Sequence, residues 1–122
     1  MNVLEELVAW QKARELRKRI SVLVRMFPDY EKYKLIDQIK RSSRSISANI
    51  AEGFGRFHYQ ENIQFCRQAR GSLTETLDHL YVALDEEYIS EDEFKEHNIL
   101  IIETIKVLNG YISYLKKAKN ND

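Results

Sequence analysis

The sequence predicts an all-α fold, an antiparallel up-down-up-down four-helix bundle. Apolar side chains recur every three or four residues through four long segments, which is the spacing of a helix that buries one face. One proline and four glycines in 122 residues are too few for the many tight turns of a β-sandwich. Because the connections between the segments are short, neighbouring helices should run antiparallel and pack as a single domain over residues 1–122.

The first helix is predicted over residues 4–27. Pro28 cannot continue the hydrogen-bond ladder of a helix and pushes Phe27 out of the helical conformation, so the helix should end there. Spacings of three and four residues mark its apolar face, which consists of Ala13, Leu16, Ile20, Leu23 and Phe27.

The second helix is predicted over residues 31–52. Gly53 and Gly55 should end it, because glycine tolerates the left-handed conformation that follows the last turn of many helices. The apolar face of this helix consists of Ile36, Ile39, Ser43, Ile46 and Ile50.

The third helix is predicted over residues 59–86. Its one break is Gly71, which costs about 1 kcal/mol relative to alanine in an exposed helix interior but would let a neighbouring element approach closely. The apolar face of this helix consists of Cys66, Leu73, Leu77, Leu80 and Leu84.

The fourth helix is predicted over residues 90–117. Ser90 and Glu93 have the spacing of a capping box, and the acidic first turn suits the positive end of the helix dipole. Lysines near the other end suit the negative end of the dipole. The apolar face consists of Phe94, Ile101, Ile105, Leu108, Ile112 and Leu115.

The charges are balanced overall but unevenly distributed. Lys+Arg and Asp+Glu are 19 each, so the net charge is zero. Residues 1–56 contain 12 basic and 7 acidic side chains, a net charge of +5, and residues 57–122 contain 7 basic and 12 acidic ones, a net charge of −5. This asymmetry indicates a polarised surface or complementarity between subunits, or simply helix faces of different sign. The zero total argues against a protein that coats nucleic acid indiscriminately.

The sequence contains no pattern of catalytic or metal-ligating residues. Cys66, the only cysteine, excludes an intrachain disulfide and lies on an apolar face as a small core residue. His58, His79 and His97 have no His or Cys three or four residues away, and none follows an arginine by four to six residues as in one type of helical ribonuclease. We therefore expect no enzyme activity, no metal or other cofactor, and no small-molecule substrate.

The sequence shows no pattern typical of export or membrane insertion. Met1–Leu7 contains two glutamates and lacks the basic start and apolar run of a signal peptide. No apolar run approaches the ~20 residues that a membrane-spanning helix needs. We therefore expect a cytoplasmic protein without a membrane partner.

The outward side of the second helix is predicted to be an interface with another subunit. Its middle carries short side chains, which allow another backbone to come close, and the flanking Arg41 and Glu52 could join Ser45 and Asn49 in a hydrogen-bonded network. A quiet exposed face that tolerates small residues is the alternative. Aromatic residues beside the apolar faces give weak support, because aromatics are common in interfaces: Trp10, Tyr33, Phe57, Phe65, Tyr81, Tyr88, Tyr111 and Tyr114. The predicted interface consists of Gln38, Arg41, Ser45, Ala48, Asn49 and Glu52.

A basic patch is the only candidate for ligand binding. If its members gather on one rim of an oligomer, the copies would form a ring of positive potential suited to phosphate backbones. Ordinary solvated charge is the alternative. The patch consists of Arg14, Lys18, Arg25, Lys40, Arg41, Arg44 and Arg56.

Two segments resemble a known family. The sequence from Asp37 to Gly53, DQIKRSSRSISANIAEG, resembles the signature of the four helix bundle proteins encoded in intervening sequences of bacterial 23S ribosomal RNA genes. Residues Phe65–Glu75, FCRQARGSLTE, resemble the third-helix pattern of the same family, and Leu7–Ala13 and Phe27-Pro28 also fit. The departure is Ser42-Ser43, where small apolar residues are more usual.

The resemblance implies an antiparallel four-helix bundle, and similar proteins assemble as rings of five. A related bundle, the accessory variability determinant protein of diversity-generating retroelements, forms a five-fold barrel that binds nucleic acid and a reverse transcriptase. By this fold-level analogy we expect a homo-oligomer that binds RNA or DNA. The alternative is an interaction scaffold that holds other proteins and never contacts nucleic acid.

Overall fold

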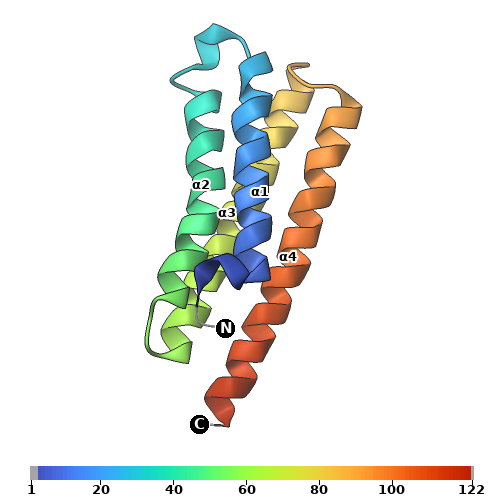
Figure 1. The fold of residues 1–122 in the computed structure, drawn as a ribbon. Helices are drawn as coiled ribbons and strands as arrows, with labels where there is room; N and C mark the ends of the chain where they lie inside the picture. Colours follow the sequence, from blue (N-terminus) through green and yellow to red (C-terminus); the bar gives the residue numbers. More distant parts are fainter. Residues whose placement is uncertain (1–2, 122) are drawn as a thin grey trace.

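The computed structural model describes residues 3–121, and four antiparallel α-helices make up most of this part. Figure 1 shows the helices alternating in direction, α1 and α3 running one way and α2 and α4 the other. The predicted up-down-up-down bundle is therefore confirmed. The α-helices are α1 (Val8–Leu23), α2 (Leu35–Phe54), α3 (Tyr59–Asp85) and α4 (Glu91–Asn120), and short 3-10 helices are η1 (Leu4–Glu6), η2 (Val24–Met26) and η3 (Asp29–Glu31).

All four helices bury one face in a common core, because each face carries apolar residues at helical spacing. Most of the predicted apolar faces are buried as expected. Four members are only half-buried, at the edge of the bundle: Ile36, Leu77, Leu84 and Ile105. The largest side chains that are almost fully enclosed include Leu16, Ile20, Ile39, Ile46, Leu73 and Leu108.

The prediction of one continuous α-helix over 4–27 was wrong at its start, and the last turn before Phe27 is a 3-10 helix. Leu7 is extended, with φ −76° and ψ 113°, and separates η1 from α1. At the other end α1 tightens into η2, and Phe27 is extended with ψ 149° before Pro28, as the proline requires. The predicted stop at Phe27 is confirmed.

The predicted start of the second helix at residue 31 was also wrong. The turn after Pro28 forms η3 instead, and Lys34, with φ −122° and ψ −105°, separates it from α2. The Glu31 carboxylate accepts a hydrogen bond of 2.8 Å from the Tyr88 hydroxyl. This contact ties η3 to the α3–α4 connection, which competes with extension of α2.

The second helix also runs past its predicted end at residue 52. Gly53 lies buried inside α2, and Gly55, the residue after the helix, has a right-handed φ of −78°. No glycine has a positive φ within residues 3–121, so the left-handed helix stop predicted here was wrong. A Cβ on Gly53 would lie 2.7 Å from Asn62 Oδ1 and 2.9 Å from Phe65 Cβ. Gly53 is therefore needed for the close approach of α2 and α3.

Small hydroxyl residues form much of the rest of the α2–α3 contact. The buried Thr76 Oγ1 lies 2.8 Å from Ser42 Oγ, and Ser72 Oγ donates to Ser45 Oγ at 3.0 Å. Gly71, which was predicted to allow a close approach, does not: it is exposed, and a Cβ there would have no atom within 4 Å. Close packing of α3 against α2 therefore depends on Gly53 of α2 rather than on Gly71 of α3.

The end of α3 and the start of α4 are set by local backbone chemistry. Glu87 has φ 61°, and the N–H of Tyr88 donates to the Ala83 carbonyl at 2.9 Å, which closes α3 with a left-handed residue. Both hydrogen bonds of the Ser90–Glu93 capping box are present, as predicted. At its other end α4 extends past the start of α1 to Asn120 (Figure 1).

Candidate nucleic-acid interface

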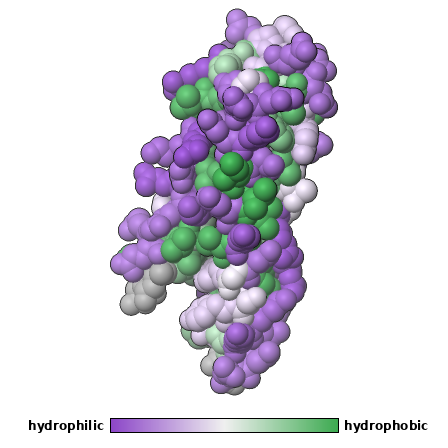
Figure 2. Space-filling model, turned by 90° about the vertical axis from the view of Figure 1, so that its right-hand side faces the viewer, coloured by the Kyte–Doolittle hydropathy of each residue, from purple (hydrophilic) through white to green (hydrophobic). Residues whose placement is uncertain are grey.

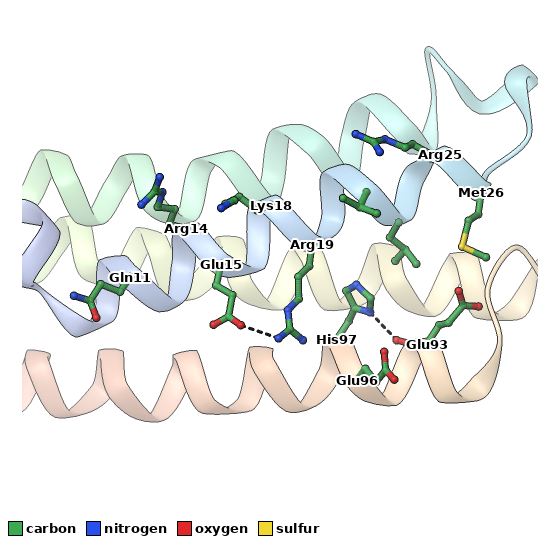
Figure 3. Close-up of a pocket in the computed structure, with 12 residues that line it drawn as sticks. Gln11, Arg14, Glu15, Lys18, Arg19, Arg25, Met26, Glu93, Glu96 and His97 are labelled. Atoms are coloured by element: carbon green, nitrogen blue, oxygen red, sulfur yellow. Dashed lines mark hydrogen bonds and ion pairs between the residues drawn. The ribbon is translucent and has the colours of Figure 1, made fainter.

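Three of the predicted basic residues line one side of α1 and η2. Arg14, Lys18 and Arg25 are spaced by four and seven residues, which places them on the same face of a helix. Figure 3 shows their side chains along the side of α1 that is nearer to α2. All three are exposed, so their charges face solvent.

Two basic residues of α2 face the same region. Arg17 Nε donates to Ser47 Oγ at 3.1 Å, which fixes how α1 and α2 lie against each other. Arg44 and Lys40 come one and two turns before Ser47 on the same side of α2. Because the two helices are antiparallel, both cations lie beside the C-terminal half of α1. Arg17 was missing from the predicted patch, although its position three residues after Arg14 could have indicated it.

The seven predicted basic residues differ in whether a carboxylate already holds them. Arg41 pairs with Asp37 at 3.3 Å, and Arg56 pairs with Glu52 at 2.6 Å and with Glu61 at 3.8 Å. Within residues 3–121, the other five have no carboxylate oxygen within 4.0 Å. We call these five, with Arg17, the basic face: Arg14, Arg17, Lys18, Arg25, Lys40 and Arg44.

The residues of the predicted subunit interface are divided between two environments. Gln38, Arg41, Ala48 and Glu52 are exposed on α2. Ser45 and Asn49 are half-buried and turn towards α3. Asn49 Nδ2 donates to Ser45 Oγ at 3.0 Å, and Ser72 Oγ donates to the same atom. The predicted network within this face thus gains Ser72 but lacks Arg41 and Glu52, because those two have charged partners one helical turn away.

A groove of about 920 Å³ lies between α1 and α4. Figure 3 shows Glu15 and Arg19 paired on its α1 side, at 2.7 Å, and Glu93 and Glu96 on its α4 side. His97 Nδ1 donates to the Glu93 carbonyl at 2.7 Å. Figure 2 shows apolar side chains along the middle of this side of the molecule, framed by hydrophilic ones. The exposed apolar residues of α1, η2 and α4 are Val8, Val22, Met26, Ile99 and Ile102.

A second hollow, of about 420 Å³, lies where α4 extends past α1. Its floor is polar at one point, where Asn62 Nδ2 donates to the Tyr111 hydroxyl at 2.9 Å. Phe57, in the α2–α3 connection, is 92% exposed beside it. Some of these aromatic residues are evident in the sequence, but the hollow is not. It forms because the C-terminal extension of α4 brings aromatic residues of α4 close to those of the α2–α3 connection. We call this hollow the aromatic pocket: Leu7, Phe54, Arg56, Phe57, His58, Tyr59, Asn62, Tyr111, Tyr114 and Leu115.

Nucleophilic and metal chemistry has little support in the described part of the chain. Burial raises the pKa of the Cys66 thiol to about 11, which keeps it protonated and unreactive at neutral pH. Across residues 3–121, no three His, Cys, Asp or Glu side chains are grouped so that they could hold a metal ion. In the same range, none of the helices combines the length and apolar character that crossing a membrane requires.

Comparison with known proteins finds a family model and solved structures that match the chain. The model of a family described as 23S rRNA-intervening sequence protein matches residues 5–110. A solved structure from Bacteroides thetaiotaomicron, described as a protein with unknown function from the S23 ribosomal protein family, is 28% identical to the chain. That match covers 85% of this chain and 97% of the other, with a TM-score of 0.78. No curated protein matches the chain.

Proposed function

The chain belongs to the 23S rRNA-intervening sequence protein family, and from that premise we propose that it is a non-catalytic, oligomeric bundle that binds structured RNA. The basic face is the proposed binding surface. The observation behind this proposal is that the six cations of the basic face gather on one side of α1 and α2 without a carboxylate within 4.0 Å in residues 3–121. Unpaired cations on a surface are an electrostatic footprint of phosphate binding.

The spacing of these cations suits an extended phosphate backbone. Arg14, Lys18 and Arg25 lie roughly 6 and 10 Å apart along the helix at 1.5 Å per residue. Successive phosphates of one strand in a duplex are about 3.4 Å apart along the axis, so the three residues would span several phosphates. Because the whole chain has zero net charge, binding should be confined to this face.

Self-association would repeat the basic face. The exposed side of α2, with Gln38, Arg41, Ala48 and Glu52, remains the proposed contact between copies. A ring of five, as the family resemblance implies, would present five basic faces around one assembly and increase avidity. Light scattering at micromolar concentration should give several times 14.5 kDa. A mass near that of one chain would overturn the proposed assembly.

Charge reversal on the basic face tests RNA binding. Lys18→Glu combined with Arg44→Glu should weaken binding to a structured RNA hairpin at least about tenfold and reduce the slope of log K against log salt by about two. Lys106→Glu combined with Arg67→Glu makes the same charge change on α4 and α3 and is the matched control. Equal losses in both variants, or no hairpin binding by the unmodified protein at about 50 mM salt, would overturn the proposal.

The groove between α1 and α4 supports an alternative function, that of a protein scaffold. Its exposed Val22 and Met26, with acidic residues on the α4 side, suit an amphipathic helix of a partner protein. A pull-down with and without nuclease separates the two functions. Loss of all partners after nuclease treatment supports RNA binding, whereas protein partners that survive it, together with absent hairpin binding, support the scaffold.

A further inference from the structure

We propose that the aromatic pocket binds an unpaired nucleobase of a single-stranded RNA segment whose phosphates lie on the basic face. This inference rests on the proposed RNA binding and adds a second kind of recognition to it. Six of the ten residues that line the pocket carry an aromatic ring. Its volume of about 420 Å³ is within the roughly 300–1,000 Å³ that is usual for small-molecule sites.

Two rings of the pocket are exposed to an extent that packing does not explain. Phe57 is 92% exposed and Tyr114 is 62% exposed, so neither contributes much to the core. Flat exposed rings offer stacking surfaces to any base, whatever its identity. Tyr114 is already nearly parallel to Tyr111, at an interplanar angle of 12°. A base that enters beside Tyr114 would extend this stack.

The back of the pocket offers hydrogen-bonding groups for the edge of a base. Asn62 is buried, and its amide donates to the Tyr111 hydroxyl at 2.9 Å. The hydroxyl of Tyr111 can in turn donate to a ring nitrogen or carbonyl oxygen of a ligand. The cation in the pocket, Arg56, is paired with Glu52 and Glu61. The pocket therefore suits an uncharged planar ring better than a phosphate group.

The start of α1 leads from the pocket towards the basic face. Leu7, the residue before α1, lines the pocket, and Trp10 and Arg14 follow it on one side of α1, four residues apart. The Arg14 guanidinium lies 5.7 Å from the centre of the Trp10 ring. A strand whose phosphates lie on the basic face would thus reach the pocket across an aromatic residue. Cationic tracks combined with stacking rings are the usual design of single-strand binding sites.

On its other side Phe57 also lines a hollow of about 490 Å³ that includes Lys119. Lys119 Nζ donates to Gln60 Oε1 at 2.6 Å. A cation next to the exposed ring could hold the phosphate that follows the stacked base. Bases would then stack on Phe57 while the backbone passes Lys119.

The test compares binding of unstructured RNA of about ten nucleotides by the unmodified protein and by Phe57→Ala combined with Tyr114→Ala. Stacking is worth about 1–3 kcal/mol per base, so single-strand affinity should fall by about 5- to 150-fold. The salt slope should stay unchanged, because no cation is removed.

Tyr33→Ala is the matched control, because Tyr33 is an aromatic residue that is 84% exposed in the connection before α2, at the other end of the bundle. A blunt duplex should bind both variants equally, and a DNA strand of the same sequence tells whether the sugar matters.

A second measurement separates this inference from the proposed function. Adenosine monophosphate, titrated while the ring signals of Tyr111 and Tyr114 are followed by NMR, should shift both. Unchanged single-strand affinity in the Phe57 and Tyr114 variant, with binding still lost on charge reversal of the basic face, would overturn the pocket and leave RNA binding intact. Absent RNA binding with shifted tyrosine signals would overturn the proposed function but support a nucleotide pocket, and absence of both would overturn both.

Discussion

Gly53 and Asn62 are in contact across the α2–α3 interface, and the contact leaves no room for a side chain on residue 53. A Cβ there would lie 2.7 Å from Asn62 Oδ1 and 3.1 Å from the Asn62 carbonyl oxygen. Asn62 also donates to the Tyr111 hydroxyl of α4. One glycine thus allows three helices to meet beside the aromatic pocket.

Replacing Gly53 by alanine should destabilise the protein by about 1–3 kcal/mol, because overpacking forces backbone or side-chain shifts. Part of the obstacle is the Asn62 carbonyl, which cannot rotate away. Urea unfolding measures the change. Gly71→Ala is the control: with no atom within 4 Å of its new Cβ, it should stabilise the helix by up to about 1 kcal/mol. A stability gain in both variants would contradict the proposed role of Gly53.

The sequence placed the four helices correctly because long amphipathic periods are strong signals, but it misassigned Gly53. A glycine near a helix end has the same appearance whether it stops the helix or admits a neighbour. The difference depends on Asn62 and Phe65, which are nine and twelve residues away on another helix. Helix ends at Leu7 and Lys34 were likewise missed, because the local 3-10 turns depend on contacts such as that of Glu31 with Tyr88.

The candidate site was only partly predictable for similar reasons. The pairing of Asp37 with Arg41 and of Glu52 with Arg56 follows from their spacing of four residues, so sequence alone could have removed these arginines from the basic patch. The proximity of α1 to α2 on the basic face required the register, which the bond from Arg17 to Ser47 reveals.

The buried hydroxyl pair of Thr76 and Ser42 should be coupled energetically. Thr76→Val keeps the shape but removes a hydroxyl within 2.8 Å of Ser42 Oγ, which should cost about 1–2 kcal/mol. The double variant Thr76→Val with Ser42→Ala should lose less free energy of unfolding than the sum of the losses in the two single variants, by at least about 0.5 kcal/mol. A double-mutant cycle in urea measures this coupling, and strictly additive losses would mean that the two hydroxyls do not interact.

Glu87→Gly should stabilise the protein. Glu87 has φ 61°, which costs a non-glycine residue about 1–2 kcal/mol, and glycine removes that cost while losing more chain entropy on folding. The net gain should be about 0.5–1 kcal/mol by thermal or urea unfolding. The neighbouring Glu86, with φ −81°, provides the control. Glu86→Gly should destabilise, and a gain there as large as at Glu87 would argue against relief of backbone strain.

The capping box at the start of α4 should make stability depend on acid pH. The Ser90 backbone N–H, and then the Ser90 hydroxyl, hold the pKa of Glu93 below its ordinary value. A lowered native pKa means that the stabilisation is present above the unfolded-state pKa and is lost as the pH falls through the native one. Glu93→Ala should therefore cost stability at pH 7 and less near about pH 3. Glu91→Ala, in the same turn but outside the box, should show a smaller change, and a Glu93→Ala cost that does not vary with pH would contradict this assignment.

The buried Cys66 thiol should make stability fall at alkaline pH. Its native pKa is raised to about 11 by burial, so the unfolded chain releases this proton first. A raised native pKa contributes stability that is complete below the unfolded-state pKa and is lost as the pH rises through the native one, here between about 9 and 11. Cys66→Ala lacks this contribution, so its cost relative to the unmodified protein should shrink over that range. Tyrosine titrations affect both proteins alike, except that of Tyr111, because the charge of the Cys66 thiolate helps to raise the pKa of Tyr111. In the native protein at about pH 8, alkylation of Cys66 should be much slower than in urea, because only the thiolate reacts. Fast native alkylation, together with a Cys66→Ala cost that is constant up to high pH, would show that the thiol is accessible and titrates normally.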